Sequence, residues 1–121
     1  MATKVDGRSR RRLLTDEEVR FSRMRALERE RLVLLKKQIS NEALAKRFGT
    51  CATVVSRAGN GHVVRDLSME EVKQIQDIFQ LRVRLDHRIK ELDGMRTAKI
   101  LGVPARIVHD VNSYAYYRNV L

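Results

Sequence analysis

Residues 41–59 read NEALAKRFGTCATVVSRAG, and this stretch determines the fold that we expect. Two short segments with apolar residues at helical spacing, Asn41–Phe48 and Ala52–Asn60, lie on either side of Gly49. Glycine adopts a positive φ at little steric cost, so Gly49 suits a tight turn between two helices. The stretch therefore predicts two short helices that pack across a turn at Gly49.

The same pattern returns 53 positions later, where Met95–Leu101 and Ala105–Ser113 flank Gly102. Sliding the sequence by this distance aligns residues 14–61 with 67–114 without a gap. Identical residues recur where two helices must approach closely, at the turn and at a core position of the second helix: Ala45 and Ala98, Gly49 and Gly102, Val55 and Val108. We infer an internal duplication.

Each copy opens with a helix-start signature, Thr15-Asp-Glu-Glu18 and Ser68-Met-Glu-Glu71. Both match the capping box S/T-x-x-E and predict a long helix after the cap. The apolar face expected in the second copy is Val72, Ile75, Ile78, Phe79, Leu85, Ile89 and Leu92, and in the first, less regularly, Val19, Met24, Leu27, Leu32, Leu35 and Ile39. The outer face of the first long helix is expected to carry Arg20, Arg23, Arg25, Arg29 and Arg31.

Composition narrows the class of function. The 121 residues carry a formal net charge of +10, which attracts polyanions, nucleic acid above all. No apolar run approaches the about 18 residues of a membrane span, so we expect a soluble protein of the bacterial cytoplasm, associated with the nucleoid and not with a membrane. Cys51 is the one cysteine and the histidines are scattered, so no metal site or other cofactor is expected. No catalytic constellation is visible, so we expect no enzyme.

The pattern Ala-x-x-x-Gly-x-x-x-x-x-Val, present in both copies, resembles the helix-turn-helix superfamily of bacterial and phage regulators and of recombinase DNA-binding regions. The resemblance implies an all-α fold with two tandem three-helix helix-turn-helix units in one compact body. The expected divisions are a disordered basic arm (1–13), a first unit (14–66) and a second unit with an aromatic tail (67–121). The alternative is a three-helix bundle that merely uses a tight turn.

In this architecture the second short helix enters the major groove. In the first copy the resemblance places Thr53, Ser56, Arg57 and Asn60 at base edges, and Lys46, Arg47, His62 and Arg65 at phosphates. In the second copy the corresponding candidates are Lys99, Arg106 and His109, but Asp110 would face phosphate there. We therefore expect the first copy to be the stronger contact. The candidates in the arm are Arg8, Arg10, Arg11 and Arg12, which either lie in the minor groove or attract DNA non-specifically.

Three functions stay open at this point. The chain is either a sequence-specific transcription regulator of phage or mobile-element type, an architectural DNA-organising protein, or an accessory factor for recombination or DNA packaging. The partner in each case is double-stranded DNA. Pairing between chains, or a protein partner bound through the second unit or the C-terminal tyrosines, is a further expectation. Tyr114, Tyr116 and Tyr117 either close the core under the last helix or form such a patch. Val63, Val64 and Leu67 are expected to pack where the copies join.

Overall fold

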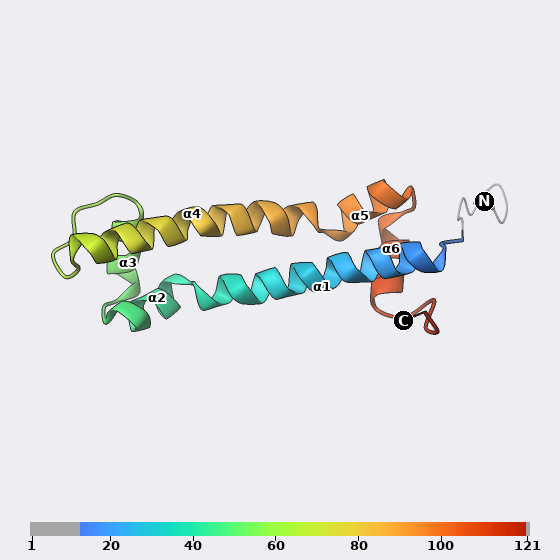
Figure 1. Ribbon diagram of the computed structural model, residues 1–121, viewed down its shortest axis with the longest axis horizontal. Helices are drawn as coiled ribbons and strands as arrows, with labels where there is room; N and C mark the ends of the chain where they lie inside the picture. The colour runs from blue at the N-terminus through green and yellow to red at the C-terminus, as the bar shows by residue number, and fades with distance from the viewer. Residues whose placement is uncertain (1–12, 121) are drawn as a thin grey trace. The chain divides into compact units, whose positions relative to one another are not determined.

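The computed structural model describes residues 13–120, and within them the chain is all-helical, as expected (Figure 1). The short helices match the predicted segments to within one residue at each end. The described residues form these helices in chain order: α1 (Asp16–Gln38), α2 (Asn41–Phe48), α3 (Ala52–Gly59), α4 (Met69–Glu91), α5 (Gly94–Leu101) and α6 (Ala105–Asn112).

Both long helices begin at the predicted capping boxes. The backbone N–H of Glu18 donates to Thr15 Oγ1 over 3.1 Å, and the N–H of Thr15 donates back to Glu18 Oε1 over 3.0 Å. Ser68 and Glu71 make the same two bonds at 3.1 and 2.9 Å. Each pair supplies acceptors for N–H groups that the first helical turn leaves without intrahelical partners, so α1 and α4 start at equivalent positions.

Contacts group the described residues into two compact units that do not follow the two sequence copies. Unit 1 holds residues 13–30 and 90–120, and unit 2 holds residues 31–89. The sequence repeat, by contrast, runs 14–66 and 67–121. In unit 1 the start of α1 packs with α5 and α6, whereas in unit 2 the start of α4 packs with α2 and α3. Each unit therefore takes its long helix from one copy and its pair of short helices from the other.

The core of unit 2 is apolar. Its buried residues are Leu44, Ala45, Val55, Ala58, Leu67 and Ile75, and Val64, Val72, Ile78 and Phe79 are among the half-buried residues that pack on them. Val55 therefore fills the core position that the sequence predicted, and Ala45 allows the close approach of α2 and α3. Val64 and Leu67 pack as expected, but the expectation for Val63 is wrong, because its side chain is 88% exposed. Neighbouring side chains of an extended segment point to opposite sides, so Val63 and Val64 cannot both face the core.

The core of unit 1 joins the start of α1 to α5, α6 and the C-terminal segment. It contains Leu14, Val19, Ala98, Leu101, Val103, Ile107, Val108, Val111 and Val120, with Tyr117 partly buried against them. The Tyr117 hydroxyl also accepts a hydrogen bond of 3.0 Å from the backbone N–H of Leu14. Tyr114 and Tyr116 are about half exposed. Of the tyrosines, then, Tyr117 is the one that closes the core.

The prediction that Arg23 lies on the outer face of α1 is wrong, because its side chain is only 6% exposed. Its guanidinium donates to backbone carbonyl oxygens at Val111 (3.0 Å), Val120 (2.6 Å), Tyr116 (3.1 Å) and Tyr117 (2.9 Å). The Tyr114 ring lies 3.9 Å from the guanidinium carbon. A guanidinium can be buried in this way because its N–H donors all point in one plane and meet backbone carbonyl oxygens there.

The apolar face predicted for α1 is right at Val19, which is buried, and wrong at Met24, Leu27 and Leu35, which are exposed. The buried residues of α1 are Val19, Ser22 and Arg23, whereas Met24 and Leu27 are exposed. Ser22 is satisfied by a 2.7 Å bond from its hydroxyl to Asn112 Oδ1. A partly polar buried face has no clear apolar period, which is why the pattern in the first copy looked irregular. The face predicted for α4 is confirmed, since Ile75 and Leu85 are buried within it.

One hydrogen bond recurs at equivalent places in the two units. In unit 2 the Gln76 side chain donates to the Ala58 carbonyl over 3.3 Å, and in unit 1 the Arg23 Nε donates to the Val111 carbonyl over 3.0 Å. Positions 23 and 76, like 58 and 111, are related by the 53-residue repeat. The two units therefore share one packing arrangement between the start of a long helix and the end of the second short helix.

Candidate nucleic-acid interface

In unit 2 the turn between α2 and α3 is built around Gly49 (green in Figure 1). Gly49 has φ +66° and ψ +38°, and its N–H donates to the Ala45 carbonyl, as does the N–H of Thr50 over 2.9 Å. This left-handed cap closes α2 and reverses the chain into α3. Ser40 Oγ accepts from the Ala43 N–H and caps the other end of α2. Local backbone bonds therefore fix how α3 leaves α2.

The outward face of α3 carries the residues predicted to read bases. Thr53 and Arg57 are exposed and Ser56 is half-buried, at steps of three and four residues that place them on one helical face, and the exposed Asn60 is the C-cap directly after the helix. Val55 and Ala58, on the opposite face, are completely buried. The structure thus brings these predicted residues together on one side of a short helix whose other side is anchored in the core.

The predicted phosphate contacts Lys46, Arg47, His62 and Arg65 are all exposed in unit 2. Lys46 and Arg47 lie in the last turn of α2, and the Arg47 guanidinium carbon is 5.6 Å from the centre of the Phe48 ring. His62 follows the turn at Gly61, whose φ is +86°, and its N–H donates to the Arg57 carbonyl over 2.9 Å. These cations stand on the segments that immediately flank α3.

Unit 1 repeats the geometry with different side chains. Gly102 has φ +69°, and its N–H donates to the carbonyls of Ala98 and Lys99. The predicted residues Lys99, Arg106 and His109 are exposed, whereas Asp110 is half-buried. Asp110 occupies the position that Arg57 has in the first copy, so the outward face of α6 has an acid where α3 has a cation.

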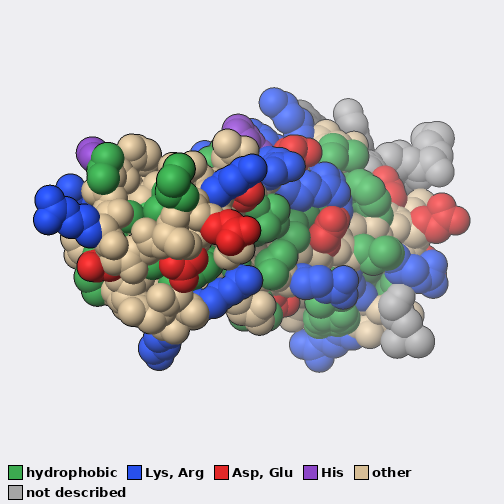
Figure 2. All heavy atoms as spheres, turned by 60° about the vertical axis from the view of Figure 1, so that its left-hand side comes forward, with side chains coloured by type: hydrophobic (Ala, Val, Ile, Leu, Met, Phe, Trp, Pro, Cys, Tyr) green, Lys and Arg blue, Asp and Glu red, His purple; other side chains and the backbone are tan. Residues whose placement is uncertain are grey.

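The basic side chains do not form one uniform surface. The face seen in Figure 2 carries many lysine and arginine side chains with acidic side chains between them. Lys36 and Asp86, for example, form an ion pair of 2.5 Å between side chains that are each nearly half exposed. A specific interface would therefore depend on local clusters of cations and not on the overall charge.

Arg82 is a positioning residue that the sequence reasoning missed. Its guanidinium donates to Asn41 Oδ1 over 2.8 Å and lies 3.8 Å from the centre of the Phe79 ring, so it ties α4 to the first residue of α2. Burial lowers the pKa of Arg82, and the carboxylates of Asp86 and Glu42 oppose that shift. The 53-residue repeat did not predict this role, because Arg29, the equivalent residue of the first copy, is exposed.

The remaining expectations concern the arginines of the N-terminal arm, a metal site and a membrane span. Arg8, Arg10, Arg11 and Arg12 lie outside the described residues. Within residues 13–120, no three His, Cys, Asp or Glu side chains gather as a metal site would require. None of the helices described is both long and apolar enough to cross a membrane.

Comparison with protein-family models, with curated proteins and with solved structures finds no match for this chain. The arguments for function therefore rest on geometry, exposure and charge.

Proposed function

We propose that this protein binds double-stranded DNA by inserting α3 of unit 2 into the major groove. The observation that carries the proposal is the exposed face of α3, on which Thr53, Ser56, Arg57 and Asn60 stand opposite a fully buried anchor. A short helix held in this way can present polar side chains to base edges without giving up its own packing. The net charge of +10 supplies the long-range attraction to phosphate.

The proposed roles follow from the chemistry of the side chains. Arg57 is the residue suited to guanine, since a guanidinium donates two parallel bonds to O6 and N7. Asn60 is suited to adenine or to phosphate, and the Thr53 methyl group to a thymine methyl. Contacts of this kind carry sequence information, so we propose a sequence-specific transcription regulator.

The cations beside α3 would fix its register on the duplex. Lys46 and Arg47 at the end of α2, and His62 and Arg65 after α3, are exposed and flank the reading face in the chain. Bonds from such groups to phosphate oxygens orient a protein but do not distinguish sequences. Their loss would weaken binding to all duplexes about equally and would reduce its salt dependence.

Binding measurements on two single variants and a matched control test the proposal. Arg57→Ala should weaken binding to the preferred duplex about tenfold or more, which corresponds to the loss of one bidentate base contact. Arg84→Ala removes the same charge from an exposed position of α4 and should change binding little. Equal losses for the two variants would mean that Arg57 contributes only charge. No retention of any duplex at low salt would contradict DNA binding altogether.

The second candidate, an architectural protein that binds DNA with weak specificity, is favoured by one observation. The face of α6 offers Arg106 and His109 beside the acidic Asp110, so it is a poor reader of bases and could at most add affinity. Selection from a pool of randomised duplexes separates the two functions. A regulator should prefer its selected sequence by roughly 10³-fold over random duplex, whereas an architectural protein should show almost no preference.

A further inference from the structure

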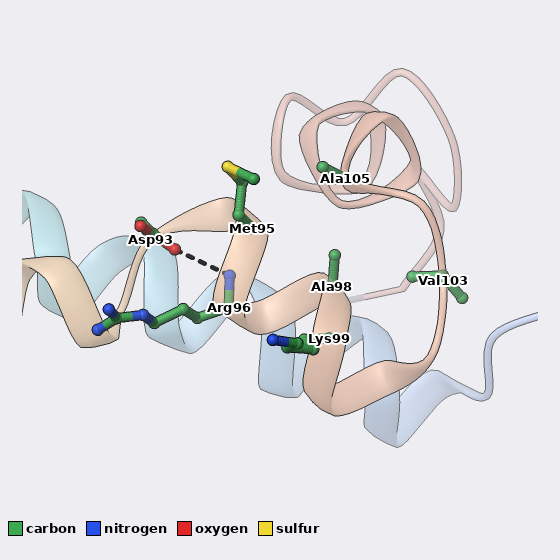
Figure 3. Close-up of a pocket in the computed structure, with 7 residues that line it drawn as sticks. All are labelled: Asp93, Met95, Arg96, Ala98, Lys99, Val103 and Ala105. Atoms are coloured by element: carbon green, nitrogen blue, oxygen red, sulfur yellow. Dashed lines mark hydrogen bonds between the residues drawn. The ribbon is translucent and has the colours of Figure 1, made fainter.

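Unit 1 has an open groove beside α5 and the start of α6, with a volume of about 530 Å³ (Figure 3). Its apolar lining comes from Met95 and Ala98 on α5, from Val103 in the turn and from Ala105 at the start of α6. In Figure 3 the Ala98 side chain points toward Ala105, with Met95 further along the same helix. Ala98 and Val103 also belong to the core, so the floor of the groove is fixed.

Two large apolar side chains of α5 are exposed in this region. The Met95 side chain at the groove is 75% exposed, and the Ile100 side chain is 60% exposed. Ile100 lines a neighbouring hollow of about 440 Å³, which shares Arg96 and Lys99 with the groove. Apolar surface of this kind is unfavourable in water and is typical of surfaces that become covered by a partner.

The fold itself does not require apolar residues at these two positions. By the 53-residue repeat, Met95 is equivalent to Glu42 and Ile100 to Arg47. Unit 2 makes the same pair of short helices and the same left-handed turn with charged, exposed residues at both places. The apolar side chains are therefore specific to the surface of unit 1 and do not support its core.

The charge beside the groove is positive. Arg96 and Lys99 are exposed and line both hollows. Asp93 is the acid in the lining of the groove itself, and its Oδ1 accepts a 2.8 Å bond from the Arg96 N–H and caps α5. The neighbouring hollow also has an acid, Glu91, beside Arg25. An incoming carboxylate would thus meet two available cations, whereas an incoming cation would be repelled.

We propose that this groove binds an acidic amphipathic helix of a partner protein. Apolar side chains at one face of that helix would pack on Met95, Ala98 and Ala105, and flanking Asp or Glu side chains would pair with Arg96 and Lys99. This is the helix-in-groove mode of recognition, which needs an apolar trough with charges at its rim. DNA is the less suitable occupant, since phosphates would use the two cations but leave the exposed Met95 side chain in water. The inference does not depend on DNA binding by unit 2.

A labelled peptide tests the proposal on the full chain. The probe is a helical peptide with leucines at i, i+3, i+4 and i+7 and glutamates between them, and its affinity is measured by fluorescence anisotropy. Met95→Glu and Lys99→Glu should each weaken its binding about tenfold or more, which corresponds to about 1.4 kcal/mol. Both side chains are exposed, so the variants should fold, and circular dichroism checks this. Lys46→Glu, the equivalent change in unit 2, is the matched control and should leave the affinity unchanged.

Three results would overturn the proposal. Equal affinity for a peptide of the same composition in shuffled order would show attraction to a cationic protein and not a groove. Equal weakening by Lys46→Glu and Lys99→Glu would have the same meaning. If the peptide does not bind and Lys99→Glu instead weakens duplex DNA binding, the surface is a phosphate contact. Because the peptide and the duplex are measured separately, failure of this inference leaves the proposed function of α3 untouched.

Discussion

Replacing Arg23 by methionine should destabilise the protein strongly, although the residue is a cation in a cationic chain. Methionine keeps an unbranched stem that can fill much of the same space, so the main loss is the set of guanidinium hydrogen bonds. Two of these bonds, to the carbonyls of Val111 and Val120, are buried. Hydrogen bonds to a charged group contribute about 1.5–3 kcal/mol each, but bonds from one group do not add fully. We expect a loss of about 3 kcal/mol in the free energy of unfolding.

Urea unfolding followed by circular dichroism measures this loss. With an m-value of about 2 kcal/mol per molar urea, the midpoint should fall by about 1.5 M. Arg29→Met is the matched control, because Arg29 is exposed on the same helix and its replacement should change stability by no more than about 0.5 kcal/mol. Arg23→Lys should recover only part of the loss, since a compact ammonium cannot reach all the carbonyls that surround the edge of the planar guanidinium. A loss for Arg23→Met no larger than that for Arg29→Met would refute the reasoning.

Three further changes test other parts of the fold. Gly59→Ala should lower the free energy of unfolding by about 1–2 kcal/mol, because a Cβ there would lie 2.1 Å from the Phe79 ring. The loss should be smaller in a Phe79→Leu background, and an unchanged loss would contradict the contact. Gly49→Ala should cost about 1–2 kcal/mol in thermal unfolding through its positive φ alone, since a Cβ there meets no atom within 4 Å. Thr15→Ala and Ser68→Ala should each cost about 1 kcal/mol and speed amide exchange in the first turn of their helix; unchanged exchange would mean that the capping boxes do not form in solution.

The parts of the fold that the sequence predicted are those that local chemistry determines. The capping boxes, the turn glycines and the bounds of the short helices depend on residues within a few positions of one another. Val55 could be assigned to the core, and Thr53 and Arg57 to the surface, because helical spacing separates the two faces. The exposure of the candidate reading residues was therefore predictable.

The partners of the long helices could not be predicted in the same way. An apolar face says that a helix is buried on one side but not which helices cover it. The face of α1 was also misread, because Ser22 and Arg23 are buried polar residues whose bonds depend on Asn112 and on the C-terminal segment, far away in the sequence. One difference between the copies does indicate that α1 buries a more polar face than α4. Arg25 and Ala26 occupy the positions that Ile78 and Phe79 have in the second copy.

That difference matches the contacts that the start of each long helix makes with the short helices of the other copy. In unit 1 the Arg25 Nε donates to Thr97 Oγ1 over 2.8 Å, and a second Arg25 nitrogen donates to the Glu91 carbonyl. In unit 2 the equivalent positions are Ile78 and Leu44, both in an apolar cluster.

If α1 packed against α2 and α3 of its own copy, its residues would meet the partners that α4 has in unit 2. Arg25 would then face Leu44, and Ala26 would leave empty the space over Gly59 that the Phe79 ring fills. Losing a fully buried phenylalanine ring costs about 3–5 kcal/mol, and the partly buried Phe79 ring would cost less. Burying a guanidinium without an acceptor adds several kcal/mol more. These differences favour the observed pairing, and the length of α1 favours it too, because at about 1.5 Å per residue an unbroken helix to Gln38 holds Arg25 about 20 Å from α2.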